Sequence, residues 1–175
     1  FLYRNGVYIE PSIVTALVFI IGIAGVVAIY LSMYVLGGVL AIVSSILDGV
    51  DGEIARLFNR ETEFGAILDT TLDRIVNTLL ITGIIYQGFK VGELSLGIEY
   101  LTLSSLALLG SIYVSFISNL VKDREFIARA RASFPWPTRD VRITVIALAL
   151  IFHKPLLGLA YILLSCWFFI ARALV

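Results

Sequence analysis

The sequence predicts an all-α, polytopic membrane protein with six transmembrane helices, and two observations favour this fold. Its 175 residues are 59% hydrophobic and have a mean hydropathy of +0.99, well above the apolar share of soluble domains. Six apolar segments also approach the ~20 residues that an α-helix needs to cross a bilayer. They cover residues 12–31, 34–58, 65–89, 97–121, 138–152 and 155–173.

Taken in chain order, the six segments differ in where they become polar. The first is almost entirely apolar, whereas the second is apolar only to Leu47 and then turns acidic. Its end must therefore project into water or into a polar cavity of the bundle. The third and fourth are long enough to span a bilayer. The fifth is short, and Pro155 favours a helix break between it and the sixth.

Small residues punctuate three of these segments, and such positions let helix backbones approach closely in lipid. They are Gly22 and Gly25, Gly37 and Gly38, and Gly110 with Ser111. No internal repeat or low-complexity segment is evident, so residues 1–175 are expected to form one membrane domain. The chain begins with Phe1, and no cleavable signal precedes the first segment, which predicts a fragment of a longer polypeptide.

The basic residues predict the orientation of the helices in the membrane. If the N-terminus is inside, 11 basic residues fall on the cytoplasmic side and only Lys90 and Lys154 fall outside. The positive-inside rule then favours a cytoplasmic N-terminus and a cytoplasmic C-terminus. We therefore expect a multi-pass protein of the cell membrane whose acidic segment, residues 48–73, opens at the cytoplasmic face.

The acidic charge of the chain is concentrated between residues 48 and 73, in the stretch DGVDGEIARLFNRETEFGAILDTTLD. At helical spacing Asp48 and Asp51 share one face, and Asp69 and Asp73 share one face of the next segment. Two such faces brought together would form a cluster of four carboxylates, which needs a cation to stay ionised. Hard oxygen ligands of this kind suit Mg²⁺, Mn²⁺ or Ca²⁺ and not zinc.

The spacing of this segment resembles the signature of the CDP-alcohol phosphotransferase family at every defined position. Written out, it is D48-x-x-D51-G52-x-x-A55-R56-(x8)-G65-x-x-x-D69-x-x-x-D73. Weaker similarity extends to EPSIVT near the start, which resembles the P-N-x-x-T element of the family with Ser12 in the Asn place and Thr15 in the Thr place. The resemblance implies transfer of a substituted phosphate from a CDP-alcohol to the hydroxyl of a second alcohol, with release of CMP.

The resemblance also implies roles for individual residues. Asp48, Asp51 and Asp69 are the expected ligands of one or two Mg²⁺ or Mn²⁺ ions, and Asp73 is the expected base and a further ligand. The implied donor is CDP-diacylglycerol, a CDP-ether lipid or CDP-inositol. Gly52 and Ala55 strip one helix face so that a flat cytidine can lie against it. The implied donor-binding residues are Asp48, Asp51, Gly52, Ala55, Arg56, Gly65 and Thr15.

A basic stretch before and within the fifth segment is the candidate acceptor site. Arg139 and Arg142 stand three residues apart, and Lys122 and Arg124 could join them around an anionic acceptor such as inositol phosphate. A second interpretation is an interfacial loop that meets anionic lipid headgroups, with Trp136 as its anchor. Nucleic-acid binding is not expected, because the basic residues lie beside a membrane and form no known reading module.

Two other functions share some of these features. An aspartate-rich membrane prenyltransferase also binds diphosphate through metal, but it does not call for Gly52, Ala55 and Arg56. A divalent-cation transporter would need acids that reach toward both faces, and after Asp73 none follows until Glu93. The family resemblance further implies a homodimer, and a fused cytidylyltransferase domain would be a natural neighbour before Phe1.

Overall fold

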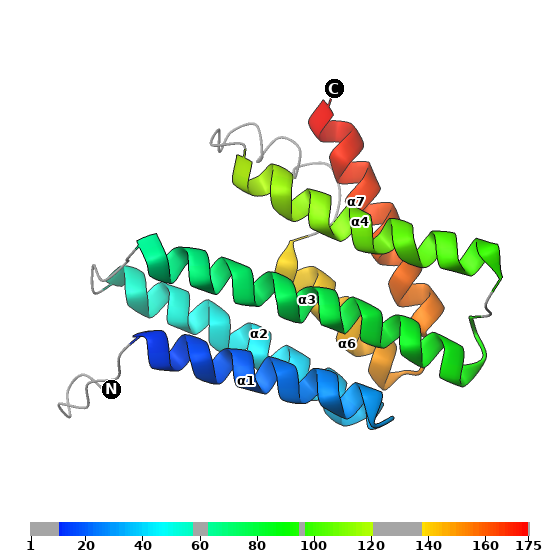
Figure 1. The fold of residues 1–175 in the computed structure, drawn as a ribbon, viewed down its shortest axis with the longest axis horizontal. Coiled ribbons are helices and arrows are strands. Elements are labelled where there is room, and N and C mark those ends of the chain that lie inside the picture. Colours follow the sequence, from blue (N-terminus) through cyan, green and yellow to red (C-terminus); the bar gives the residue numbers. More distant parts are fainter. Residues whose placement is uncertain (1–10, 58–62, 95–96, 121–137, 175) are drawn as a thin grey trace.

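The computed structural model describes residues 11–57, 63–94, 97–120 and 138–174, which form six α-helices and no strand (Figure 1). The predicted all-α fold is thus confirmed for this part of the chain. Each predicted segment coincides with one helix to within two residues at either end. The helices are α1 (Pro11–Tyr30), α2 (Tyr34–Leu57), α3 (Glu63–Val91), α4 (Ile98–Leu120), α6 (Arg139–Ile151) and α7 (Pro155–Leu174).

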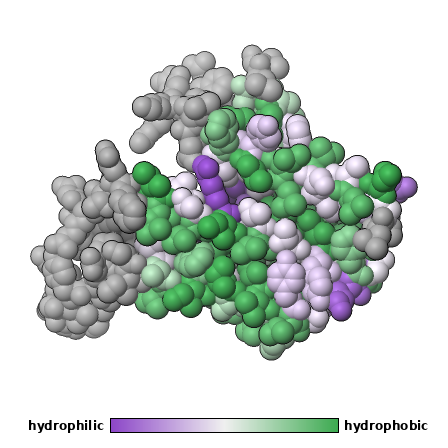
Figure 2. Space-filling view, in the orientation of Figure 1, coloured by the Kyte–Doolittle hydropathy of each residue, from purple (hydrophilic) through white to green (hydrophobic). Residues whose placement is uncertain are grey.

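Two of the described helices are long and apolar enough to cross a membrane, over Ile98–Ser118 and Pro155–Ala173. Shorter apolar stretches run over Val14–Tyr30 and Tyr34–Gly49. The described surface is largely hydrophobic in the view of Figure 2, as expected where lipid replaces water around a protein. Helix α6 is short, as predicted: its 13 residues rise about 20 Å, less than the ~30 Å hydrocarbon core of a bilayer.

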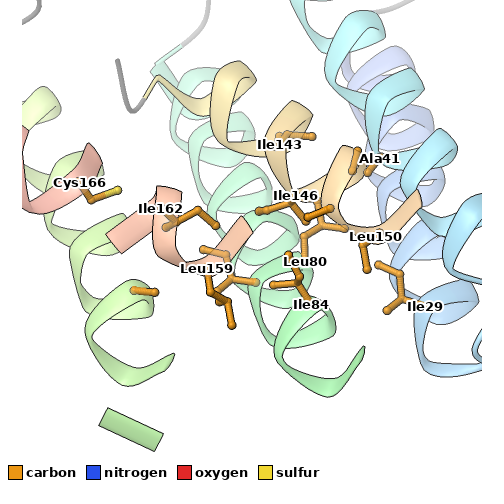
Figure 3. Close-up of a cluster of buried hydrophobic side chains, with 14 of the residues drawn as sticks. Ile29, Ala41, Leu80, Ile84, Ile143, Ile146, Leu150, Leu159, Ile162 and Cys166 are labelled. Carbon is orange, nitrogen blue, oxygen red and sulfur yellow. The ribbon is translucent and has the colours of Figure 1, made fainter. Parts of the chain in front are cut away.

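The short helix α6 lies at the centre of the bundle. Helices α1 and α2 form one closely packed pair and α4 and α7 form another, while α3 and α6 lie between the two pairs. Figure 3 shows how Ile146 and Leu150 of α6 meet Leu80 and Ile84 of α3, with Leu159 of α7 beside them. These side chains are essentially inaccessible to solvent, so α6 joins the two pairs through close packing of branched apolar side chains.

The small residues in the first two helices serve helix packing, as predicted. A Cβ atom added to Gly37 would lie 2.9 Å from the carbonyl oxygen of Gly25, and one added to Gly38 would lie 2.8 Å from the carbonyl oxygen of Ala147. Both distances are below normal van der Waals contact, so only glycine fits. Helix α2 therefore touches α1 on one side and α6 on the other, backbone against backbone.

Two tight corners close one end of the bundle, which we call the closed end and define by residues 31–33 and 152–154. Ser32 and His153 lie in the left-handed region, with φ of 64° and 53°. The residue after each donates its amide to a carbonyl five residues earlier, at 2.8 and 2.9 Å, the pattern of a Schellman helix end. The Tyr34 and His153 rings meet at 5.5 Å, and Lys154 pairs with Glu93 at 3.4 Å.

Candidate functional site

Three of the four predicted aspartates converge at the opposite end of the bundle, which we call the aspartate end and define by Asp48, Asp69 and Asp73. Asp48 belongs to α2, and the other two stand one turn apart on α3. One carboxylate oxygen from each lies within 4.8 Å of the other two. The side chains of Asp48 and Asp73 are only 19% and 21% exposed, so little water screens the repulsion between these charges.

The cluster fits a hard divalent cation, because it offers three carboxylate oxygens from two helices within reach of one another. Asp51 stands three residues after Asp48 on α2, which places it at the same end of that helix. Its side chain lies outside the described residues, as do those of Gly52, Ala55 and Arg56, although the backbone there is helical. Their predicted roles stay predictions.

Arg139, the first residue of α6, binds two of the three aspartates. Its Nη1 donates to Asp48 Oδ2, and its Nη2 donates to Asp73 Oδ1 at 2.6 Å. One guanidinium thus connects α6 with α2 and α3 and partly neutralises the cluster. The sequence predicted that Arg139 binds the acceptor substrate. The structure places its guanidinium against the carboxylates of Asp48 and Asp73.

A cavity of about 250 Å³ opens beside Asp73, between α3, α4 and the start of α6. Three arginines and one aspartate contribute to its wall, which favours an anionic ligand. Hydroxyl and amide groups make up most of the remainder. Its lining residues are Thr70, Asp73, Arg74, Asn77, Val114, Ser115, Ser118, Thr138, Arg139 and Arg142.

Ser115 on α4 holds two of the cavity arginines in place. Arg74 Nη2 donates to its carbonyl oxygen and Arg142 Nη2 donates to its hydroxyl, each at 3.3 Å. Arg142 is only 3% exposed, which is unusual for an arginine and fits a functional group held inside a membrane protein. The structure therefore brings Arg139 and Arg142 to one cavity and adds Arg74. Lys122 and Arg124 lie outside the described residues.

Thr15 and Gly65 also belong to the aspartate end. The hydroxyl of Ser44 donates to the carbonyl of Val18 at 3.1 Å, and this bond sets the start of α1, with Thr15, beside the end of α2 that carries Asp48. Gly65 lies one turn before Asp69 on α3. Both positions are compatible with the donor-binding roles that the resemblance implies.

Several cavity residues were not identified from the sequence, notably Arg74, Asn77 and Ser115. Their spacing contains a signal. Asn77 follows Asp73 by four residues, and Ser115 follows Ser111 by four, so each pair forms a polar stripe along an otherwise apolar helix. Polar stripes in membrane helices usually face the bundle interior or a cavity, and this rule would have found all but Arg74.

The chain is similar to enzymes that act on CDP-alcohols. It is 27% identical over 159 residues to archaetidylinositol phosphate synthase of Pyrococcus horikoshii, covering 91% of this chain and 78% of that protein. It is 35% identical over 112 residues to the bifunctional IPC transferase and DIPP synthase of Aquifex aeolicus, covering 64% and 24%. A third relative, CDP-diacylglycerol–inositol 3-phosphatidyltransferase of Drosophila melanogaster, is 45% identical over 53 residues, covering 30% and 24%.

The length of these matches differs, since the chain spans about a quarter of the bifunctional relative and 78% of the archaeal synthase. The family comparison is more complete. The model of the CDP-alcohol phosphatidyltransferase family matches residues 8–173, nearly the whole sequence. The matched region includes the signature at residues 48–73, the three converging aspartates and the arginine-lined cavity. The chain therefore belongs to the CDP-alcohol phosphatidyltransferase family.

Proposed function

We propose that this chain transfers a substituted phosphate from a CDP-alcohol to a hydroxyl of inositol phosphate and releases CMP. The observation that carries this proposal is the direct junction, at Asp73, between a carboxylate cluster and an arginine-lined cavity. The first site suits a metal-bound diphosphate, and the second suits an anionic alcohol. The archaeal relative, archaetidylinositol phosphate synthase, supports this choice of acceptor, and the Drosophila relative, which is named for inositol, supports an inositol ring.

Asp48, Asp51 and Asp69 are the proposed ligands of one or two Mg²⁺ or Mn²⁺ ions, with Asp73 as a further ligand. When bound, a divalent cation would neutralise the donor diphosphate and stabilise the departing CMP. The three aspartates that the structure describes lie close enough to share one ion. Asp51 would complete the set from the same face of α2 as Asp48.

The donor would lie along the end of α2. Gly52 and Ala55 leave one helix face without large side chains, so that cytidine can approach the backbone. Arg56 follows one position later, and its guanidinium can bind the diphosphate through two parallel hydrogen bonds. Thr15 and Gly65 lie at the same end of the bundle and would complete this pocket.

Asp73 is the proposed general base. Its carboxylate belongs to the metal cluster and also lines the cavity, so it can accept the proton of an acceptor hydroxyl that enters there. Arg139 donates to one of its oxygens at 2.6 Å. This bond holds the carboxylate in place between the aspartate cluster and the cavity.

The acceptor phosphate would bind to the cavity arginines. Arg74 and Arg142 both donate to Ser115, so their guanidinium groups are held in place before the ligand arrives, which lowers the entropy cost of binding. Arg139, one turn before Arg142 on α6, would bind the same phosphate. Lys122 and Arg124 are proposed as further contacts from the preceding segment.

The same proposal includes the arrangement in the membrane. We propose six crossings with both termini in the cytoplasm, so that the aspartate end faces the compartment that holds nucleotides. Helix α3 has 29 residues and extends about 44 Å, more than a ~30 Å hydrocarbon core, which lets Asp69 and Asp73 reach the interface. A homodimer is proposed from the family, and the longer bifunctional relatives support a further domain.

A turnover screen tests this function. The purified protein would be supplied with Mg²⁺, with CDP-diacylglycerol or CDP-inositol as donor, and with inositol phosphate, inositol, glycerol phosphate or serine as acceptor. Release of CMP that requires both a donor and inositol phosphate is the expected result. Turnover of a prenyl diphosphate without any CDP-alcohol, or metal uptake into vesicles without CMP release, would replace the proposal with a prenyltransferase or a transporter.

A further inference from the structure

Asn77 lines the cavity, and it carries a buried polar atom that no residue in the described part of the chain satisfies. It lies on α3, one turn beyond Asp73, and is only 6% exposed. Its Nδ2 donates to the hydroxyl of Ser111 on α4 at 2.9 Å. Its Oδ1 is buried and has no hydrogen-bond partner among the residues that the structure describes. Buried amide oxygens are nearly always hydrogen-bonded, so this atom calls for a partner from outside the described protein.

The position of Asn77 indicates what that partner would be. Asp73 lines the cavity one turn before Asn77, while Arg74, Arg139 and Arg142 supply positive charge to the same cavity. An alcohol that places its reacting hydroxyl at Asp73 and its phosphate at the arginines would present its remaining hydroxyls to the α3 wall. A hydroxyl donates one hydrogen bond, which is what Asn77 Oδ1 lacks.

We infer that Asn77 determines acceptor specificity by accepting a hydrogen bond from a second, non-reacting hydroxyl of a polyhydroxylated acceptor. This inference rests on the proposed function and adds to it the class of molecule selected, a polyol phosphate. A helix-packing role accounts for the bond from Nδ2 to Ser111 and leaves Oδ1 without a partner. A site built to bind a hydroxyl rejects an analogue that lacks it far more strongly than an apolar site does.

Deoxy analogues of the acceptor test the inference. Wild type, Asn77→Leu and Ser111→Ala would be compared for kcat/KM of CMP release with CDP-diacylglycerol, using myo-inositol 1-phosphate and its monodeoxy analogues. Leucine has a similar size and cannot accept a hydrogen bond. Ser111→Ala is the matched control, because it removes the helix-packing bond of Asn77 and leaves the cavity wall unchanged.

In the wild type, loss of one particular non-reacting hydroxyl should lower kcat/KM about 10- to 100-fold, the range expected for one buried hydrogen bond. In Asn77→Leu, kcat/KM for the complete acceptor should fall by a similar factor. The same variant should show no further fall in kcat/KM with that deoxy analogue. Ser111→Ala should discriminate as the wild type does. The inference would be overturned if Asn77→Leu and the wild type discriminate equally between the complete acceptor and its deoxy analogues. It would also be overturned if no deoxy analogue lowers kcat/KM in the wild type.

A second variant and a binding measurement keep the inference testable if Asn77→Leu does not fold. If Asn77→Leu is unstable, Asn77→Ala removes the same oxygen with a smaller side chain. Thermal stabilisation by myo-inositol 1-phosphate, measured without donor, should be larger than stabilisation by the critical deoxy analogue, and equal stabilisation counts against the inference. A wild type that releases no CMP with any acceptor contradicts the proposed function instead, so the two failures are distinguishable.

Discussion

Arg139 occupies a position between the two halves of the proposed site, and its chemistry links them. Its guanidinium donates to Asp48 and Asp73, which are also proposed metal ligands, while it lines the cavity proposed for the acceptor. A guanidinium and a divalent cation compete for the same carboxylates, since both are bound through their positive charge.

Removing a metal ligand should abolish turnover without unfolding the protein. We expect Asp48→Asn and Asp69→Asn each to lower CMP release by ~100-fold or more, because each removes charge from a cation that stabilises the transition state. Chelation should have the same effect, and added Mg²⁺ should reverse it. Asp140→Asn is a suitable control, since Asp140 is exposed and accepts a bond from Ser45 at 3.2 Å outside the cluster. Full turnover in excess chelator contradicts the mechanism.

Asp73 should behave differently from the other aspartates. Asp73→Asn should still bind CDP in the presence of Mg²⁺, yet lose CMP release by roughly 100-fold, the usual scale for loss of a general base. Calorimetric titration of CDP and steady-state rates measured on one preparation would separate the two effects. A near-normal rate would assign the base to another residue.

Arg139→Gln should affect acceptor binding and metal binding in different ways. The KM for inositol phosphate should rise about 10-fold, the cost of one charge-assisted hydrogen bond. Affinity for Mn²⁺, measured by paramagnetic resonance, should stay equal or increase because a competing positive charge is gone. Weaker Mn²⁺ binding with an unchanged KM would show that Arg139 serves the carboxylates alone.

Much of this site could be predicted from residue spacing. Helical periodicity put Asp69 and Asp73 on one face, and the structure confirms their convergence with Asp48. The bonds from Arg139 could not be predicted, because Arg139 and Asp48 are 91 positions apart and meet only through the packing of α6 against α2. Asn77 and Ser115 lay within reach of the same periodicity argument.

At the scale of helices, the bounds were predictable and the packing partners were not. The apolar runs of the sequence locate every described helix. The central place of α6 follows from side-chain fit, since Ile146 and Leu150 interlock with α3, and composition does not reveal such fit. The short α6 also buries Arg142, which a hydropathy argument assigns to the interface.

The contact between α2 and α6 gives a stability prediction. Gly38→Ala should destabilise the protein by about 1–3 kcal/mol, because its Cβ would meet the Ala147 carbonyl oxygen at 2.8 Å and Ile151 Cγ1 at 2.9 Å, and overpacking of this kind strains a core. Gly49→Ala on the same helix is the control, since nothing lies within 4 Å of its added Cβ and alanine favours helix. Thermal unfolding in detergent measures both. Equal stabilities would contradict the backbone contact.

At the scale of the whole molecule, orientation is the main prediction. Single cysteines at Lys90 and Arg172, placed in a chain whose buried Cys166 is replaced by alanine, should react differently with a membrane-impermeant maleimide in intact cells. Position 90 should be labelled at once, and position 172 only after lysis, because the positive-inside rule puts the aspartate end in the cytoplasm. The reverse pattern would place the site on the other face.

The two corners at the closed end have a consequence for how the cavity can open. Helix α3 continues into α4 at that end, and α6 turns into α7 there through residues 152–154. At the aspartate end, α4 and α6 are joined by residues 121–137, the longest connection between described helices. The α6 wall of the cavity is thus held at its far end by the tight corner of residues 152–154. Thermal tilting of the cavity helices about the closed end would then change their spacing at Asp73 and Arg139 more than the spacing at the corners.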